Sequence, residues 1–123
     1  IIVSDEIESI STAKEMRKLL DALHLTQDID RLRNRKARTG KSALRGRGKK
    51  IGKSVLFVTK SSKELEKACG SFLGVEVRSV KNLSVLDLAP GSDPIRLTVY
   101  SKAALDEISK IKSSHLELMV KIK

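Results

Sequence analysis

The residues with the clearest chemistry lie in one short stretch, residues 31 to 53, which is rich in lysine and arginine and has no aspartate or glutamate. It holds 11 of the 25 basic residues of the chain. The rest of the chain has 14 basic and 15 acidic residues, so the net charge of +10 comes from this stretch. Because like charges at this density repel one another, they favour a polyanionic partner or solvent over a packed interior.

The chemistry that these side chains predict is phosphate binding. Lysine and arginine neutralise phosphates and release condensed counterions, and arginine adds bidentate geometry. The stretch has no aromatic residue, which argues against a protein that binds single strands by stacking on bases. We therefore predict that it binds the backbone and shape of folded RNA. The charges alone leave open a nuclear-localisation signal or a solvated basic linker.

Other residue types that could do chemistry are poorly placed. Gly52-Lys53-Ser54 resembles the end of a nucleotide-binding loop, but that motif requires glycine where Arg47 stands, and a helix after it. Cys69 lies on the apolar side of a predicted helix, where a small core residue is expected. His24 and His115 are too far apart in sequence to indicate a metal site. The sequence thus predicts no enzyme, no cofactor, no metal site and no small-molecule substrate.

The elements before and within the basic stretch follow from periodicity and glycine content. Ile1 to Val3 are typical of the end of a strand and do not begin with Met, so we expect further chain before them. Apolar residues at every third or fourth position predict one helix over residues 5 to 23 and a short one over 26 to 33. Four glycines between residues 40 and 52 disfavour a helix, so we predict an extended loop over 31 to 53.

After the basic stretch, strands and helices alternate. Runs rich in β-branched residues predict strands at 54 to 59, 75 to 80 and 95 to 100. Helices are predicted around 65 to 72, at 82 to 88 and after Ser101. This order is typical of an α/β fold with a mostly parallel sheet, helices on both faces and, here, a long basic loop.

We divide the chain accordingly. Residues 1–30 form the end of a strand and helices of the α/β domain, 31–53 the RNA-binding loop, 54–111 the strand–helix repeats, and 112–123 a C-terminal tail. No apolar run approaches the roughly 20 residues that a membrane helix needs, so no membrane partner is expected. The single cysteine excludes an internal disulfide and suits a reducing compartment.

Two stretches are similar to one known family. The run from Arg33 to Lys41, followed by Arg45-Gly46-Arg47 and Lys49-Lys50, resembles the basic signature of the universal large-subunit ribosomal protein L-four family in its archaeal and eukaryotic form. The stretch from Asn82 to Tyr100 resembles it as well, in the expected order and spacing. The resemblance covers roughly residues 1 to 110, and the short end after it is more similar to the archaeal form.

The resemblance implies a structural role in the ribosome, in the cytoplasm, with large-subunit ribosomal RNA and neighbouring ribosomal proteins as partners. The family's N-terminal half, with its loop toward the exit tunnel, is absent from this sequence, so no tunnel function is carried over. RNA contact is carried over onto nine residues: Arg33, Arg35, Lys36, Arg38, Lys41, Arg45, Arg47, Lys49 and Lys50. We assign the stretch from Asn82 to Tyr100 to the fold, and we expect Arg96 on the surface of a strand.

Two other functions remain as alternatives. One is a non-ribosomal regulator that binds structured or messenger RNA through the same loop. The other is a nucleotide-binding enzyme of the doubly wound type, which would carry a glycine-rich turn between a strand and a helix. The strand-to-helix turns here, Thr59-Lys60-Ser61 and Tyr100-Ser101-Lys102, contain no glycine.

Overall fold

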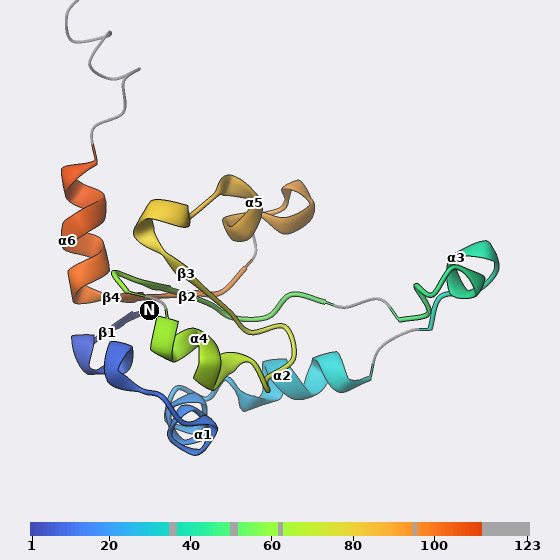
Figure 1. Cartoon of the computed structure of the whole chain (residues 1–123), viewed down its shortest axis with the longest axis horizontal. Coiled ribbons are helices and arrows are strands. Elements are labelled where there is room, and N and C mark those ends of the chain that lie inside the picture. Colours follow the sequence, from blue (N-terminus) through green and yellow to red (C-terminus); the bar gives the residue numbers. More distant parts are fainter. Residues whose placement is uncertain (35–36, 50–51, 62, 95, 112–123) are drawn as a thin grey trace, which may run out of the picture.

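The computed structural model describes residues 1–34, 37–49, 52–61, 63–94 and 96–111. They form an α/β domain and a long arm that carries part of the basic stretch away from it (Figure 1). Within these residues, no helix is long and apolar enough to cross a membrane.

A parallel sheet lies at the centre of the domain. Its strands are β1 (Ile2–Val3), β2 (Leu56–Thr59), β3 (Glu76–Ser79) and β4 (Thr98–Ser101), in the order β1-β4-β2-β3. Phe57 of β2 lies opposite Val77 of β3 and Val99 of β4. All four residues of β2 are buried, as expected for a strand covered on both faces. The α/β fold with a parallel sheet is therefore confirmed.

Helices cover both faces of this sheet. One face carries the 3-10 helix η1 (Asp5–Ser9), α1 (Ala13–Ala22), α2 (Thr26–Arg33) and α4 (Lys63–Cys69). The other face carries η2 (Val80–Asn82), α5 (Val85–Leu88), η3 (Pro90–Ser92) and α6 (Lys102–Lys110). Side chains alternate along β2, so that Phe57 packs with Met16 and Leu65 on the first face, whereas Leu56 packs with Ala104 on the second.

The predicted helix over residues 5 to 23 is wrong in one respect, because the chain breaks between η1 and α1. Thr12 is the N-cap of α1, and its hydroxyl accepts a hydrogen bond from the Glu15 amide at 3.4 Å. The break leaves η1 free to direct two carboxylates, Asp5 and Glu8, to backbone amides of other elements. Tertiary contacts thus override a continuous apolar period.

Other boundaries shift by a few residues. α4 ends at Cys69, so Gly70 follows the helix instead of lying inside it. β4 begins at Thr98, three residues later than predicted, and Ile95 lies outside the described residues. Ser101 caps α6 as expected, accepting a hydrogen bond from the Ala104 amide at 3.1 Å. The predicted tail, residues 112 to 123, also lies outside the described residues.

Candidate nucleic-acid interface

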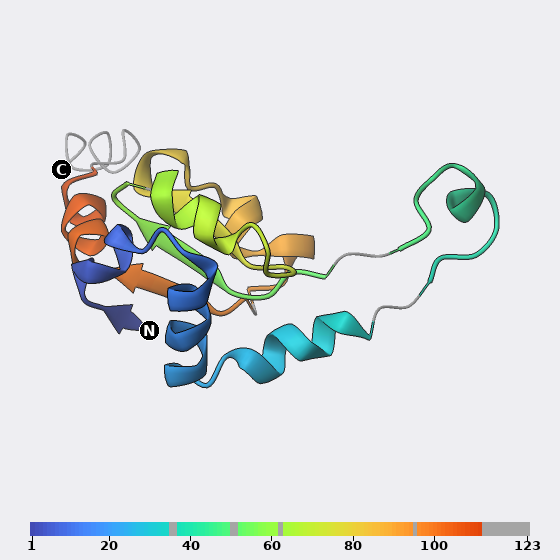
Figure 2. The same ribbon diagram turned by 60° about the horizontal axis from the view of Figure 1, so that its bottom comes forward.

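The far end of the arm is a closed lobe, which we define as residues 37–49 (Figure 2). Ala37 and Lys49 form an antiparallel bridge at its base, and the Arg38 amide donates to the Gly48 carbonyl at 2.8 Å. Between them lies one helical turn, α3 (Lys41–Leu44). The prediction of an extended loop without helix is therefore wrong for this part of the stretch.

Glycine explains why the turn forms. Gly40, before α3, has φ of 68°, and Gly46, after it, has φ of 73°. This left-handed region suits glycine and strains most other residues. The two glycines thus begin and end the turn. The prediction counted four glycines between residues 40 and 52 and therefore expected no helix.

Backbone hydrogen bonds hold the lobe together. The Leu44 amide donates to the Gly40 carbonyl at 3.3 Å, and the Arg47 amide donates to the Ser42 carbonyl at 3.1 Å. Residues 37–49 are all described, and none of them is buried. The lobe is therefore held in one conformation by backbone hydrogen bonds and has no apolar core. Its side chains are available to a partner.

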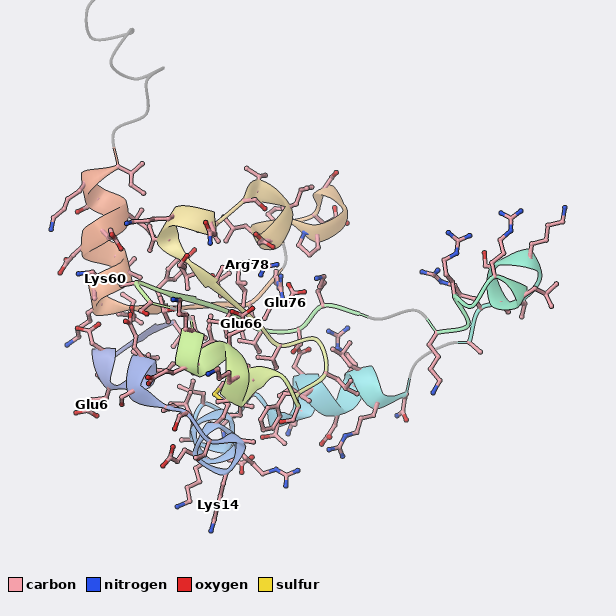
Figure 3. The ribbon with its side chains drawn as sticks, viewed as in Figure 1. Glu6, Lys14, Lys60, Glu66, Glu76 and Arg78 are labelled. Carbon is pink, nitrogen blue, oxygen red and sulfur yellow. The ribbon has the colours of Figure 1, made fainter. Side chains whose placement is uncertain are left out.

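Five of the nine predicted RNA-binding residues are brought together on this lobe and are exposed: Arg38, Lys41, Arg45, Arg47 and Lys49. None of these five forms an ion pair with another described residue. Figure 3 shows nitrogen-tipped side chains pointing outward around α3, far from the sheet. This concentration of unpaired positive charge is suited to phosphate groups.

The other predicted residues are placed differently. Arg33 lies in the last turn of α2, and its guanidinium pairs with Asp30 at 3.1 Å. It therefore belongs to the near end of the arm and not to the lobe. Arg35, Lys36 and Lys50 lie outside the described residues.

The ends of the basic stretch differ from the lobe, since their charges are neutralised. The Arg31 guanidinium pairs with Asp28 at 2.9 Å, and the Lys53 ammonium pairs with Glu76. The second carboxylate oxygen of Asp28 accepts a hydrogen bond from the Ser54 hydroxyl, which joins the two chain segments of the arm. We call these segments, residues 28–33 and 52–55, the root of the arm.

A buried arginine ties the root to the sheet. The Arg96 side chain is 2% exposed, so the prediction that it lies on the surface is wrong. Its guanidinium donates to the Glu76 carboxylate and to the carbonyls of Ser54 and Asp87, each at 2.9 Å. Because guanidinium has five donors and no acceptor, it can satisfy several carbonyls at once.

Glu76 compensates this buried charge. Burial alone would raise the pKa of its carboxyl, but hydrogen bonds from Lys53 and Arg96 outweigh that cost and hold the pKa below its ordinary value. Sequence reasoning missed this pair. The signal was present, however, since Glu76 and Arg96 have opposite charges and stand near the amino ends of strands in a parallel sheet.

An apolar contact also holds the root against the sheet. The Leu32 side chain is buried and lies directly against two glycines. A Cβ atom on Gly52 would lie 2.5 Å from Leu32 Cδ2, and one on Gly74 would lie 2.3 Å from Leu32 Cδ1. Any larger residue at these positions would displace Leu32, so the glycines allow α2 to pack closely on the sheet.

Doubly wound enzymes bind nucleotides at the carboxyl ends of the strands. In this domain, those ends lie at the end of the sheet away from the root. Here the Glu8 carboxylate accepts hydrogen bonds from the Lys60 amide at 2.8 Å and the Ser101 hydroxyl at 2.9 Å. Asp5 accepts one from the Ala103 amide, in the first turn of α6, at 2.7 Å. The donors that a phosphate would use are therefore occupied by carboxylates of the chain itself.

Cys69 fits the prediction of a core residue. It is buried on the side of α4 that packs on the sheet, and burial raises the pKa of its thiol to about 12. Since the thiolate is the nucleophile, such a thiol is inert at neutral pH.

Comparison with known proteins identifies the family of the chain. The sequence model of the Ribosomal protein L4/L1 family matches residues 1–111. The large ribosomal subunit protein uL4 of Sulfurisphaera tokodaii is 38% identical over 120 residues, which cover 96% of this chain and 45% of that protein. The proteins of the same name from Methanococcus aeolicus and Haloarcula marismortui are 39% and 37% identical, each over 89% of this chain and 44% of their own length.

The chain thus spans a little under half the length of these curated relatives. The match to the family nevertheless includes both the sheet and the arm, since it extends from the first residue to the end of α6. The chain therefore belongs to the Ribosomal protein L4/L1 family.

Proposed function

We propose that the chain is a structural constituent of the large ribosomal subunit in the cytoplasm, where it binds and stabilises ribosomal RNA through the lobe and catalyses no reaction. The observation that carries this proposal is the group of five exposed and unpaired basic residues on a lobe held away from the sheet. The relatives are named as large ribosomal subunit proteins. Ribosomal RNA and neighbouring ribosomal proteins are the partners that follow from this role.

The lobe supports this function through its charge and its shape. Each lysine or arginine that meets a phosphate releases condensed counterions, which favours binding. Because backbone hydrogen bonds already fold residues 37–49, less conformational entropy is lost when RNA binds than for an extended chain. We assign the remaining proposed contacts to Arg33, at the end of the root, and to Arg35, Lys36 and Lys50, which lie in sequence between the root and the lobe.

The root sets the direction of the arm. Leu32 packs on Gly52 and Gly74, and Arg96 binds the Ser54 carbonyl, so both chain segments are attached to the domain before RNA is present. The domain then acts as a support from which the lobe reaches into folded RNA.

An enzymatic role finds no support at the edge where a doubly wound enzyme would bind its nucleotide. A nucleotide phosphate there would have to displace the Glu8 carboxylate from its hydrogen bonds with Lys60, Ser61 and Ser101. It would also meet like charge from Asp5 and Glu8. This is the physical reason for proposing that the domain supports the arm and does not bind a nucleotide.

A pair of charge-matched variants tests the proposal. Replacing Arg38, Arg45 and Arg47 with alanine removes three lobe charges, and replacing Lys14, Arg17 and Lys18 removes three from α1. Lys14 lies on α1, which Figure 3 places well apart from the lobe. We expect the lobe variant to lose at least a hundredfold in affinity for large-subunit ribosomal RNA at 0.15 M salt, since each charged contact contributes about 1 kcal/mol or more.

The α1 variant should bind within about threefold of the wild type, and both should keep the wild-type melting temperature within a few degrees, because surface substitutions have small effects on stability. Equal affinities for the two variants would contradict the assignment of RNA binding to the lobe. A collapse of the melting temperature in the lobe variant alone would show that the lobe belongs to the fold.

A further inference from the structure

We propose that Leu44, at the tip of the lobe, is an apolar contact for an unstacked base of the bound RNA, and so selects bulges and junctions over continuous duplex. Its 87% exposure is the highest among the large hydrophobic residues that the structure describes. The proposal rests on the RNA-binding function proposed above. It adds that the lobe prefers RNA with an unstacked base to a continuous duplex.

The side chain of Leu44 packs in neither hydrophobic cluster of the domain, and only its backbone contributes to the fold of the lobe. Leu44 is the last residue of α3, and its backbone amide completes the turn by donating to Gly40. A large apolar side chain that stabilises no core and is held on an ordered turn is suited to burial against a partner.

The surroundings of Leu44 indicate which partner. Arg45 follows it directly and Lys41 stands three residues before it on the same helical turn; both are exposed and form no ion pair with a described residue. An apolar protein groove would leave these charges desolvated, whereas phosphates on either side of an unstacked base would neutralise them. Apolar side chains that contact or wedge between bases are a known device in nucleic-acid recognition, and folded RNA offers unstacked bases at bulges and junctions.

Two other exposed apolar residues provide the matched control. Val85 and Leu86 of α5 are 78% and 79% exposed, nearly as much as Leu44. They lie on α5, away from the lobe (Figure 1). The basic residue that lines a pocket together with Leu86 is Arg78, and its guanidinium is paired with Asp87. Leu86→Ala therefore removes the same side chain from a different surface.

The test measures binding of the wild type, Leu44→Ala, Leu86→Ala and Arg45→Ala to large-subunit ribosomal RNA over a salt series. We expect Leu44→Ala to weaken binding about five- to twentyfold at every salt concentration, because the lost contact is apolar. Its plot of log K against log salt should stay parallel to the wild type. Arg45→Ala should instead make the slope shallower by about 0.9, and Leu86→Ala should match the wild type.

A continuous duplex provides the second arm of the test. On a fully paired duplex, Leu44→Ala should bind as the wild type does, because no unstacked base is present. Wild-type affinity of Leu44→Ala for ribosomal RNA, or an equal loss on the duplex, would overturn the role of Leu44 while leaving the proposed function intact. Failure of the wild type to bind ribosomal RNA at low salt would overturn both.

Discussion

At the scale of single residues, the most informative is Arg96, because a buried guanidinium normally destabilises a protein unless it is fully compensated. Here Glu76 supplies the opposite charge, and backbone carbonyls accept the remaining donors of the guanidinium: those of Ser54 and Asp87 at 2.9 Å, and those of Val55 and Gly74 at 3.5 Å. The same residues lie where the arm leaves the sheet. Arg96 thus stabilises the fold and, by binding the Ser54 carbonyl at the root, helps to set the direction of the arm.

Glu76 makes the stability of the domain dependent on pH. Its folded pKa lies below the ordinary value of 4.5, so it contributes stability that is present above that value and is lost as the pH falls through the folded pKa. We predict that Glu76→Gln is less stable than the wild type by about 1–3 kcal/mol at pH 7, because Arg96 and Lys53 lose their charged partner. The difference should shrink as the pH falls below 4.5 and through the folded pKa of the carboxyl.

Urea unfolding between pH 7 and pH 3 measures this difference. Glu66→Gln is the matched control, because Glu66 is exposed on α4 and forms no ion pair with another described residue. The control should follow the wild-type curve at every pH. A loss of stability in Glu76→Gln that stays the same over the whole pH range would show that its effect is steric and does not come from the charge.

At the scale of elements, the arm consists of two parts that differ in how they are held. The lobe depends on backbone hydrogen bonds and left-handed glycines, whereas the root depends on close packing of Leu32 and on ion pairs. The root is therefore part of the cooperative fold, and the lobe can be changed in sequence without unfolding the domain. This division suits a protein that binds its partner through a charged lobe and holds that lobe in place through the root.

Gly74→Ala tests the packing at the root. Its φ of 74° lies in the left-handed region, and the new Cβ would lie 2.9 Å from the Gly52 carbonyl oxygen and 2.3 Å from Leu32 Cδ1. We predict a loss of about 2–4 kcal/mol in the free energy of unfolding, from backbone strain and overpacking together.

The control for this substitution is Gly48→Ala in the lobe, where a Cβ would meet no atom within 4 Å and φ is not positive. It should change the free energy of unfolding by no more than about 0.5 kcal/mol. Thermal or urea unfolding of both variants gives the comparison. Equal stabilities would mean that Leu32 does not fix the root as the structure indicates.

At the scale of the whole molecule, the parallel sheet could be predicted from local patterns. Residues 54 to 59 are a short apolar run rich in β-branched residues, and residues 75 to 80 combine three valines with polar residues; such patterns depend little on distant contacts. The break between η1 and α1 could not be predicted, since it depends on hydrogen bonds that the Glu8 and Asp5 carboxylates accept from the amides of Lys60 and Ala103, which are 52 and 98 positions away. Long-range contacts of this kind leave no local period in the sequence.

The same distinction applies to the candidate interface. The charge of residues 31 to 53 predicted a polyanionic partner, because composition alone determines it. The division into a paired root and an unpaired lobe required the positions of Asp28, Asp30 and Glu76, two of them on α2 and one on a strand far along the chain. Glycine content misled the prediction for α3, because glycine favours the ends of a helical turn as strongly as it disfavours its middle.

The most direct test of the whole account is the salt dependence of binding between the wild-type chain and large-subunit ribosomal RNA, with a duplex of unrelated sequence as control. With the five lobe residues on phosphates, log K should fall by about 4 or more for each tenfold rise in salt if the duplex coefficient applies, and ribosomal RNA should be preferred. A shallow slope, no preference over the duplex, or no binding at low salt would contradict the central claim that the lobe binds ribosomal RNA.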